Sequence, residues 1–375
     1  MKIAIAGDFS PRATLNEACK RLDKGILSDI MPLVSDCKFK IVNFETTIET
    51  PDAKPIKKNG PSLKSCKESA DVLKTAGFNI LTMANNHIYD YGEVGLKHTV
   101  GIIEELGLPY VGVGENLNAA EQTLFVENEG ETLAIINCCE HEFSIATDKS
   151  AGANPLNPIR QYYAIKEARE KADYVIVITH GGHEYFQLPS LRMQETYRFF
   201  IDAGADTVVN HHQHCYSGYE VYNGKPIFYG IGNFCFDKRN INGPHTEWND
   251  GFIVKLDLKK DSISYELIPY QQCLNKPQVK PLENRRDFDS SIEKFNEIIA
   301  NPQNLKSKVE EYYDSLSRGR MMVFQPSRNR FILSATYRNL LPLFLSQKHS
   351  IIYQNNIDCE SHRDVILHAL KKFNI

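Results

Sequence analysis

Polar side chains of the kinds that bind divalent cations recur after the short apolar runs of this sequence. In chain order these residues are Asp8, Asn43, Glu45, Asn85, Asn86, His87, Asp90, His180, His183, Glu184, Asn210, His211, His212 and His214. Each one alone is compatible with a helix cap, a turn or a buried histidine. Together they bring carboxylate, amide and imidazole groups, without cysteine, to five strand ends. This combination favours Mn, Fe or Zn in an incompletely closed catalytic site, and we predict one or two divalent cations.

Spacing and side-chain chemistry suggest different roles within this set. In an extended segment His212 and His214 point to the same side, because side-chain direction alternates along a strand, and His211 points elsewhere. A carboxylate such as Glu45 can bridge two cations, whereas a neutral imidazole cannot. Asn86 offers a carbonyl oxygen. The adjacent His87 can donate a proton or stabilise charge on a substrate.

The elements that must position these residues alternate between strand and helix over the first 210 residues. Strand-like apolar runs occupy residues 3–6, 41–44, 80–83, 110–113, 134–137, 175–179 and 207–209. Apolar residues at helical spacing occupy residues 66–76, 93–106, 164–171 and 190–203. This order predicts a layered α/β domain with a largely parallel sheet. Ligands collect at the carboxyl ends of such strands, where the polar residues above are expected to meet.

The second half of the chain has a different sequence pattern, with hairpin signals followed by helices. Asn223-Gly224 between two apolar runs predicts a hairpin, and residues 259–261 predict a turn between strands near 252–258 and 263–268. Helical patterns follow at 288–300, 304–317, 337–345 and 362–373. Residues 275–286, with Pro277 and Pro281, form the best linker candidate. We therefore predict a main domain at 1–274 and a helical C-terminal extension at 275–375.

Composition excludes several classes of protein. The 43 Lys and Arg residues against 47 Asp and Glu give a net charge of −4, which argues against a nucleic-acid partner. No apolar run reaches the roughly 18 residues of a membrane span, and the N-terminus reads as a strand, so we expect a cytoplasmic protein. The nine cysteines contain no C-x-x-C pair and are expected to be reduced. A homo-oligomer is compatible with these data.

The motifs resemble a known family. Asp8, Asn43-Phe44-Glu45, Asn85-Asn86-His87 with Asp90-Tyr91-Gly92, GADTVVNHHQH at 204–214 and YGIGNF at 229–234 are similar to the CapA family, named for capsule (poly-γ-glutamate) synthesis, in the calcineurin-like metallophosphoesterase superfamily. The resemblance covers residues 1–260 or so. It implies a four-layer α/β/β/α sandwich with a metal centre at the strand ends and His87 as the catalytic residue. The metal ligands that it implies are Asp8, Glu45, Asn86, His180, His212 and His214.

Two positions depart from the general superfamily pattern. Asp8-Phe9-Ser10 stands where that pattern has Asp-x-His, and Glu45 stands where it has Asp. The missing histidine leaves only Asp8, Glu45 and His214 for one of the two cations. The resemblance therefore implies one tight metal and one that is weak or absent.

Four further residues are predicted to bind substrate. Lys58 and Arg192 suit a phosphate or a carboxylate. His183 and Glu184 belong to a segment that resembles the HWGxEY-type motif of CapA-like proteins, with Gly181 in place of its Trp.

The favoured function is that of a metal-dependent hydrolase, a phosphoesterase that acts on a small molecule or on a polysaccharide or capsule precursor. In this hypothesis metal-bound water attacks and His87 is the general acid. Two alternatives keep the site: capsule or poly-γ-glutamate synthesis or processing, by amide hydrolysis or polymer handling, and a non-catalytic ligand-binding module. A dinucleotide-binding protein is disfavoured because no G-x-G-x-x-G follows the first strand. Cys138 and Cys139 are interpreted as core residues and not as a cysteine-hydrolase nucleophile.

Overall fold

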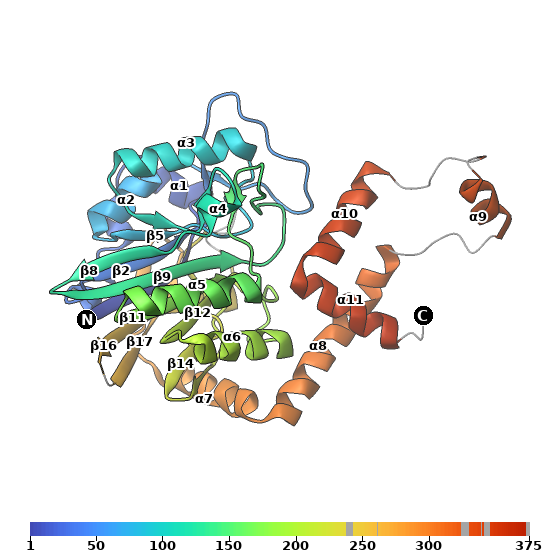
Figure 1. The fold of residues 1–375 in the computed structure, drawn as a ribbon. Coiled ribbons are helices and arrows are strands. Elements are labelled where there is room, and N and C mark those ends of the chain that lie inside the picture. Colours follow the sequence, from blue (N-terminus) through green and yellow to red (C-terminus); the bar gives the residue numbers. More distant parts are fainter. Residues whose placement is uncertain (238–242, 261, 324–329, 339, 341–345, 373–375) are drawn as a thin grey trace.

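The structure is a computed structural model that describes residues 1–237, 243–260, 262–323, 330–338, 340 and 346–372. Two β-sheets form its centre (Figure 1). The first sheet has the order β18-β17-β16-β1-β2-β5-β6, with β15 also paired to β1. Its parallel strands are β1 (Lys2–Phe9), β2 (Phe39–Phe44), β5 (Ile80–Thr82), β6 (Tyr110–Val111) and β15 (Asn233–Cys235). Its antiparallel strands are β16 (Asp250–Lys259), β17 (Ser262–Gln272) and β18 (Val279–Pro281).

The second sheet has the order β13-β14-β12-β11-β9-β8. Its four central strands are parallel, namely β9 (Glu131–Cys139), β11 (Tyr174–His180), β12 (Thr207–His211) and β14 (Lys225–Phe228). Antiparallel strands close its two edges, namely β8 (Leu124–Asn128) and β13 (Tyr219–Tyr222). Two small pairs lie outside both sheets, β3 (Thr47–Ile48) with β4 (Lys64–Ser65) and β7 (Val113–Gly114) with β10 (Gly152–Ala153).

The sheets face each other and carry helices on their outer faces. Successive side chains of a strand point to opposite faces, and β1 shows the consequence. Ile3 and Ile5 pack with Ile176 and Ile178 of the other sheet, whereas Ala4 packs on the helical side. The first sheet is covered by α1 (Ala13–Lys20), α2 (Glu68–Ala76) and α3 (Gly92–Glu105), and the second by α5 (Pro158–Lys171) and α6 (Leu191–Ala203). The predicted four-layer α/β/β/α sandwich is confirmed.

The predicted Asn223-Gly224 hairpin is also confirmed. Strands β13 and β14 pair across it, with φ of 50° at Asn223 and 77° at Gly224. Positive φ at both central residues is the geometry of a tight turn whose twist matches the flanking strands. Strands β16 and β17 pair as expected, while Asp261 of the second predicted turn lies outside the described residues.

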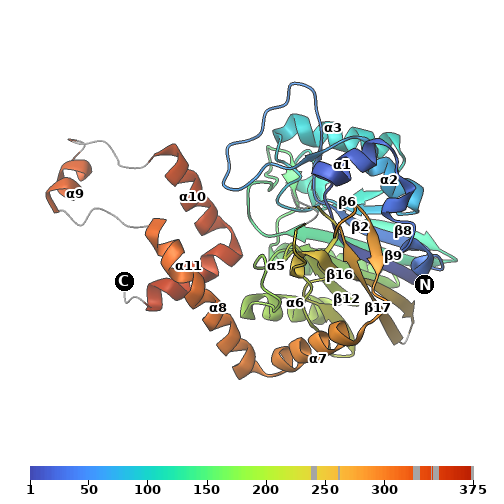
Figure 2. The ribbon, with the colours of Figure 1, turned by 180° about the vertical axis from the view of Figure 1, so that it is seen from behind.

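The C-terminal region begins against the sandwich. Strand β18 pairs with β17, and α7 (Arg286–Ala300) inserts Phe288 and Ile292 into the core between the sheets. The remaining helices are α8 (Pro302–Val323), α9 (Arg330–Tyr337), α10 (Gln347–Asp358) and α11 (Glu360–Lys372). Figures 1 and 2 show α8, α10 and α11 beside the sandwich, on the side toward which β9 points. Contacts therefore cross the predicted boundary at 274/275, and the division into two domains stays a prediction.

The sequence-based helices match in part. The predicted helix at 337–345 lies mostly outside the described residues, and α9 ends at Tyr337. Helices α1 and α10, the short helix α4 (Leu117–Ala120) and three 3-10 turns at 24–26, 31–34 and 247–249 were not predicted. Among the described residues, no helix combines the length and the apolar character that a membrane crossing needs.

Candidate metal centre

The first carboxylate of the centre is oriented by an irregularity in β1. The pairing register between β1 and β2 shifts between Ala6 and Asp8, and that between β1 and β15 shifts between Asp8 and Phe9. Such bulges re-aim side chains beside functional sites. Asp8 Oδ1 accepts a hydrogen bond from Asn43 Nδ2 at 2.7 Å, and Asp8 Oδ2 accepts one from the backbone N–H of His212 at 3.2 Å. These bonds fix both oxygens of a fully buried side chain.

His212 and His214 reach the centre by a different route from the one predicted. We expected an extended segment, but β12 ends at His211, and φ is +83° at His212 and +57° at His214. Left-handed backbone is uncommon for non-glycine residues and clusters at functional sites. His211 does point elsewhere, with its Nε2 3.1 Å from the carbonyl oxygen of Ala6. The expected convergence of His212 and His214 is therefore produced by a strained turn and not by strand alternation.

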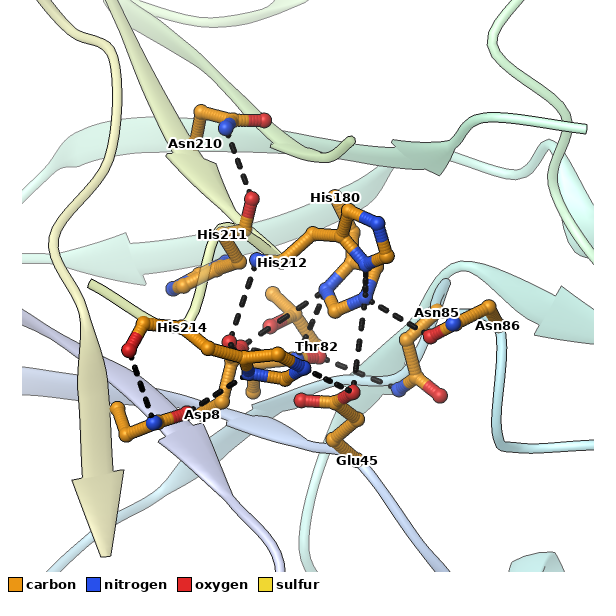
Figure 3. A network of polar contacts seen from close by, with 12 residues as sticks. Asp8, Glu45, Thr82, Asn85, Asn86, His180, Asn210, His211, His212 and His214 are labelled. Carbon is orange, nitrogen blue, oxygen red and sulfur yellow. Dashed lines mark hydrogen bonds and ion pairs between the residues drawn. The ribbon is translucent and has the colours of Figure 1, made fainter. Parts of the chain in front are cut away.

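The six predicted ligands converge at the carboxyl ends of the strands (Figure 3). Glu45 Oε1 lies 3.8 Å from His180 Nε2 and 3.9 Å from His214 Nε2. Asp8 Oδ2 lies 3.7 Å from His214 Nδ1. His180 Nε2 lies 3.1 Å from both Asn86 Oδ1 and His212 Nδ1. Residues 8, 45, 86, 180, 212 and 214, spread over more than half of the chain, thus form one cluster, and their role as metal ligands stays a prediction.

Burial controls the charge state of this cluster. It raises the pKa of the Glu45 carboxyl well above its usual range, and the nearby Asp8 raises it further. Burial lowers the pKa of His180, helped by the neighbouring His212, and burial also lowers the pKa of His214. His180 and His214 are therefore held neutral, which is the form in which imidazole binds a metal.

The residues fit a divalent cation. Neither carboxylate oxygen of Glu45 has a hydrogen-bond partner in the described part of the chain, although the residue is fully buried. A buried carboxylate without compensation is costly, and a cation supplies that compensation. Ligand atoms of Asp8, Glu45 and His214 all lie within 4.8 Å of one another. Two carboxylates and an imidazole are ligands that Mn, Fe and Zn accept.

His87 lies beside the cluster with its two ring nitrogens in different surroundings. Nδ1 donates to Asp90 Oδ2 at 2.7 Å, and Nε2 lies 4.0 Å from Glu45 Oε1. Lys58 pairs with the other oxygen of Asp90, and its Nζ lies 3.2 Å from His87 Nδ1. Burial lowers the pKa of His87, which Lys58 reinforces and Asp90 opposes. The predicted substrate residue Lys58 is thus at the centre, but its amino group is engaged with Asp90.

The other three predicted substrate residues have varied positions. Glu184 is exposed, within electrostatic range of His214, His212 and His87. His183 is buried against α8, with Nε2 3.2 Å from the hydroxyl of Tyr313. The Arg192 guanidinium lies between two carboxylates, 2.7 Å from Glu140 Oε1 and 3.0 Å from Asp364 Oδ2. Substrate binding by these residues stays a prediction.

Three further side chains contact the predicted ligands but were not themselves predicted to be ligands. Asn43 Nδ2 contacts Asp8 and lies 3.2 Å from His180 Nδ1. Asn233 Oδ1 lies 2.9 Å from His214 Nδ1, and Glu142 Oε2 accepts from Asn86 Nδ2 at 3.1 Å. Asn43 and Asn233 stand in the motifs NFE and GNF, so the signal was a polar residue at a strand end. Such outer partners orient the ligands and fix histidine tautomers.

Comparison with known proteins gives a family. The family model "Bacterial capsule synthesis protein PGA_cap" matches residues 2–238. "Capsule biosynthesis protein CapA" of Bacillus anthracis is 30% identical over 300 residues, which cover 77% of this chain and 72% of the relative. "PGA biosynthesis protein CapA" of Bacillus subtilis (strain 168) is 36% identical over 211 residues, which cover 55% of this chain and 54% of the relative. Among solved structures, calcineurin-like phosphoesterase YfkN from Bacillus subtilis aligns over 83% of this chain and 98% of its own, with 12% identity and a TM-score of 0.42.

Proposed function

Because the chain belongs to the family of bacterial capsule synthesis proteins PGA_cap, we propose that its buried centre makes it a metal-dependent hydrolase that cleaves a phosphoester. The observation that carries this proposal is the Glu45 carboxylate, fully buried beside Asp8 and three imidazoles and without a hydrogen-bond donor among the residues that the structure describes. The substrate class is a small molecule or a polysaccharide or capsule precursor. The expected cytoplasmic location and self-association stay predictions.

The chain's own residues suggest how the reaction is organised. Asp8, Glu45, Asn86, His180, His212 and His214 would hold one or two divalent cations. A bound cation supplies Lewis acidity at a phosphoryl oxygen and lowers the pKa of coordinated water. Asp90 accepts the Nδ1 proton of His87 and so leaves Nε2 facing the centre, where the imidazolium form of His87 would deliver its Nε2 proton to the leaving oxygen and return to the neutral form. The exposed Glu184, within electrostatic range of His214 and His212, would select among approaching substrates.

The test is hydrolysis of a generic aryl phosphate by the purified full chain with Mn²⁺. We expect metal-dependent turnover in the wild type. In His87→Gln we expect kcat to fall by about 10²–10⁴-fold with unchanged bound metal, because a general acid contributes that much. His98→Gln, on α3, is the matched histidine control and should behave as the wild type. Absence of turnover with every divalent metal, in protein shown to hold metal, would refute the proposal.

The names of the curated relatives favour a second candidate. One is a capsule and the other a PGA biosynthesis protein, so the same centre could act on an amide bond of poly-γ-glutamate or handle this polymer. Incubation with poly-γ-glutamate separates the cases by the size of the product. Shortening by the wild type but not by His87→Gln supports amide hydrolysis. Binding without shortening, equal in both proteins, supports a non-catalytic binding module.

A further inference from the structure

A second group of metal-binding side chains lies between the sandwich and the C-terminal helices. Glu142 follows β9, Cys359 separates α10 from α11, and His362 lies in the first turn of α11. One ligand atom from each of the three lies within 4.8 Å of the other two. From this geometry we propose that Glu142, Cys359 and His362 form a second divalent metal site, for zinc or another cation that accepts a thiolate.

The local backbone explains how the three side chains meet. Helix α10 ends at Asp358, and Cys359 has the extended values φ −68° and ψ 122° before α11 begins at Glu360. The break presents Cys359 and His362 from one side of the helix junction, and Glu142 approaches from the loop of the sandwich. A thiol, an imidazole and a carboxylate form a donor set that zinc uses with three protein ligands, which leaves a fourth position for water. The first centre contains no sulfur ligand, so the two sites prefer different cations.

The surrounding charges favour a cation at this place. Three carboxylates lie near Cys359, namely Glu140, Glu142 and Glu360, and two of them already pair with a basic side chain. Glu140 pairs with Arg192 at 2.7 Å and accepts from Ser361 Oγ at 2.6 Å, and Glu360 contacts His141 Nδ1 at 2.6 Å. Glu142 accepts from the neutral amide of Asn86, and a carboxylate has acceptor sites beyond one such bond. A divalent cation would therefore meet negative charge that the protein's own cations do not neutralise.

The proposed site is connected to the first centre by a single amide. Asn86 Nδ2 donates to Glu142 Oε2 at 3.1 Å, and Asn86 Oδ1 lies 3.1 Å from His180 Nε2. A cation on Glu142 would fix the carboxylate that orients this amide. Glu142 is thus a positioning residue for the first centre. The second cation would also fasten α10 and α11 to the end of the sandwich at which that centre lies.

The test uses Co²⁺, because thiolate coordination produces a sulfur-to-cobalt charge-transfer band in the near ultraviolet that oxygen and nitrogen ligands do not produce. The full chain is stripped of metal, titrated with Co²⁺, and examined by absorption and elemental analysis. We expect the wild type to show the band. We expect Cys359→Ser to lose the band and to bind one equivalent of metal less than the wild type. Cys37→Ser is the matched control, because Cys37 is also buried, with Sγ 4.0 Å from a carboxylate oxygen of Asp36, and it lies outside the proposed site.

A second variant keeps the result interpretable if Cys359→Ser does not fold. The half-buried His362 can be replaced by Gln, which should weaken Co²⁺ binding at this site at least tenfold and shift the band. The double variant Asp8→Asn/His180→Gln, which removes ligands of the first centre, should keep the band, so the proposal can fail or hold independently of the proposed hydrolysis. No band in the wild type, or an unchanged band in Cys359→Ser, would overturn the second site.

Discussion

At the residue scale, the proposed catalytic role of His87 depends on Asp90, which holds its Nδ1. Asp90 accepts from Nδ1, pairs with the buried amino group of Lys58, and also accepts from the backbone N–H of Leu63 at 2.6 Å. Outer partners of this kind typically change activity by about 10–100-fold when they are lost. We expect Asp90→Asn to lower kcat within that range without loss of metal from the first centre.

The same substitution should also destabilise the fold, which permits a control. Removing one member of a buried ion pair costs roughly 3–5 kcal/mol, because the other charge is left uncompensated. The double variant Asp90→Asn/Lys58→Met removes both charges and should recover most of the free energy of unfolding while kcat stays low. Urea unfolding and steady-state kinetics measure the two effects. Recovery of activity together with stability would show that Asp90 acts only on the fold.

Asp237 provides a residue-scale prediction of pH dependence. Its carboxylate accepts from the backbone N–H groups of Arg12 and Leu15 at 2.8 and 3.0 Å, at the start of α1, and burial nevertheless raises its pKa from 3.8 to about 6. A folded-state pKa above the unfolded value means that the folded state binds the proton more tightly. Ionisation of Asp237 therefore costs stability, in full above pH 6, and the cost is relieved as the pH falls from about 6 to about 4.

The Asp237 contribution can be isolated by substitution. The shift of about two pKa units corresponds to about 3 kcal/mol as an upper value. Urea unfolding between pH 4 and 7 should show that Asp237→Asn loses this rise in stability on acidification, whereas Asp29→Asn, at an exposed position, keeps it. Parallel pH profiles for the wild type and Asp237→Asn would contradict the prediction.

Much of the centre could be predicted residue by residue, because the carboxyl ends of neighbouring parallel strands lie at the same edge of a sheet. Residue type and strand-end position placed Asp8, Glu45, Asn86 and the three histidines among a longer set of candidates, and the family resemblance selected them from it. The backbone of His212 and His214 could not be predicted, since left-handed φ at histidine is a local cost that only the finished packing maintains. The engagement of Arg192 with Glu140 and Asp364 was equally hidden, because Asp364 is 172 residues away in the sequence.

At the element scale, the position of Asp8 depends on the close approach of β1 to the segment before β15. A Cβ atom on Gly7 would lie 1.9 Å from the carbonyl oxygen of Gly232, which is backbone and has little room to move. We expect Gly7→Ala to lower the free energy of unfolding by about 2 kcal/mol or more, as overpacked cores do, and to weaken metal binding by displacing Asp8.

A second glycine serves as the control for this prediction. Gly101 lies within α3, and a Cβ there would meet no atom within 4 Å. Gly101→Ala should therefore stabilise by about 0.5–1 kcal/mol, since alanine is the better helix former. Thermal unfolding and metal titration of both variants check the contrast. Equal stability of Gly7→Ala and the wild type would mean that β1 and β15 can separate without consequence for the centre.

The elements that the sequence predicted well are those with a strong periodic signal. The parallel strands are buried on both faces and read as continuous apolar runs, as in β11, and the Asn-Gly turn requires positive φ. Helix α10 was missed because Asn355, Asn356 and Asp358 have low helix propensity. Its position depends on tertiary contacts such as that between Lys57 and Gln347, which lie 290 residues apart.

At the scale of the whole molecule, the C-terminal helices are joined to the sandwich where the strands of the metal centre end. Arg192, Glu140 and His141 of the sandwich hold Asp364, Ser361 and Glu360 of α11 through charged contacts. Helix α7 in turn completes the core between the sheets through Phe288 and Ile292. The C-terminal helices are therefore packed into the sandwich at α7 and adjoin the metal centre at α11. We expect cation binding to be coupled to the stability of the whole chain.

This coupling predicts opposite effects of one substitution on the metal-free and metal-loaded chains. Glu45 is fully buried beside Asp8 without a hydrogen-bond partner among the described residues, and burial raises its pKa. At pH 8 the metal-free protein must therefore either bury a charge or take up a proton when it folds, both of which cost stability, so Glu45→Gln should raise its unfolding temperature. Mn²⁺ at about 100 times its Kd should stabilise the wild type by about 2.7 kcal/mol, and Glu45→Gln by much less. Mn²⁺ is chosen because it disfavours thiolate ligands and so leaves Cys359 out of the comparison. Thermal unfolding with Mn²⁺ and with EDTA measures both effects. A Glu45→Gln variant that is less stable without metal and keeps the full Mn²⁺ gain would show that Glu45 is a structural side chain and that the cation, if it binds, binds elsewhere.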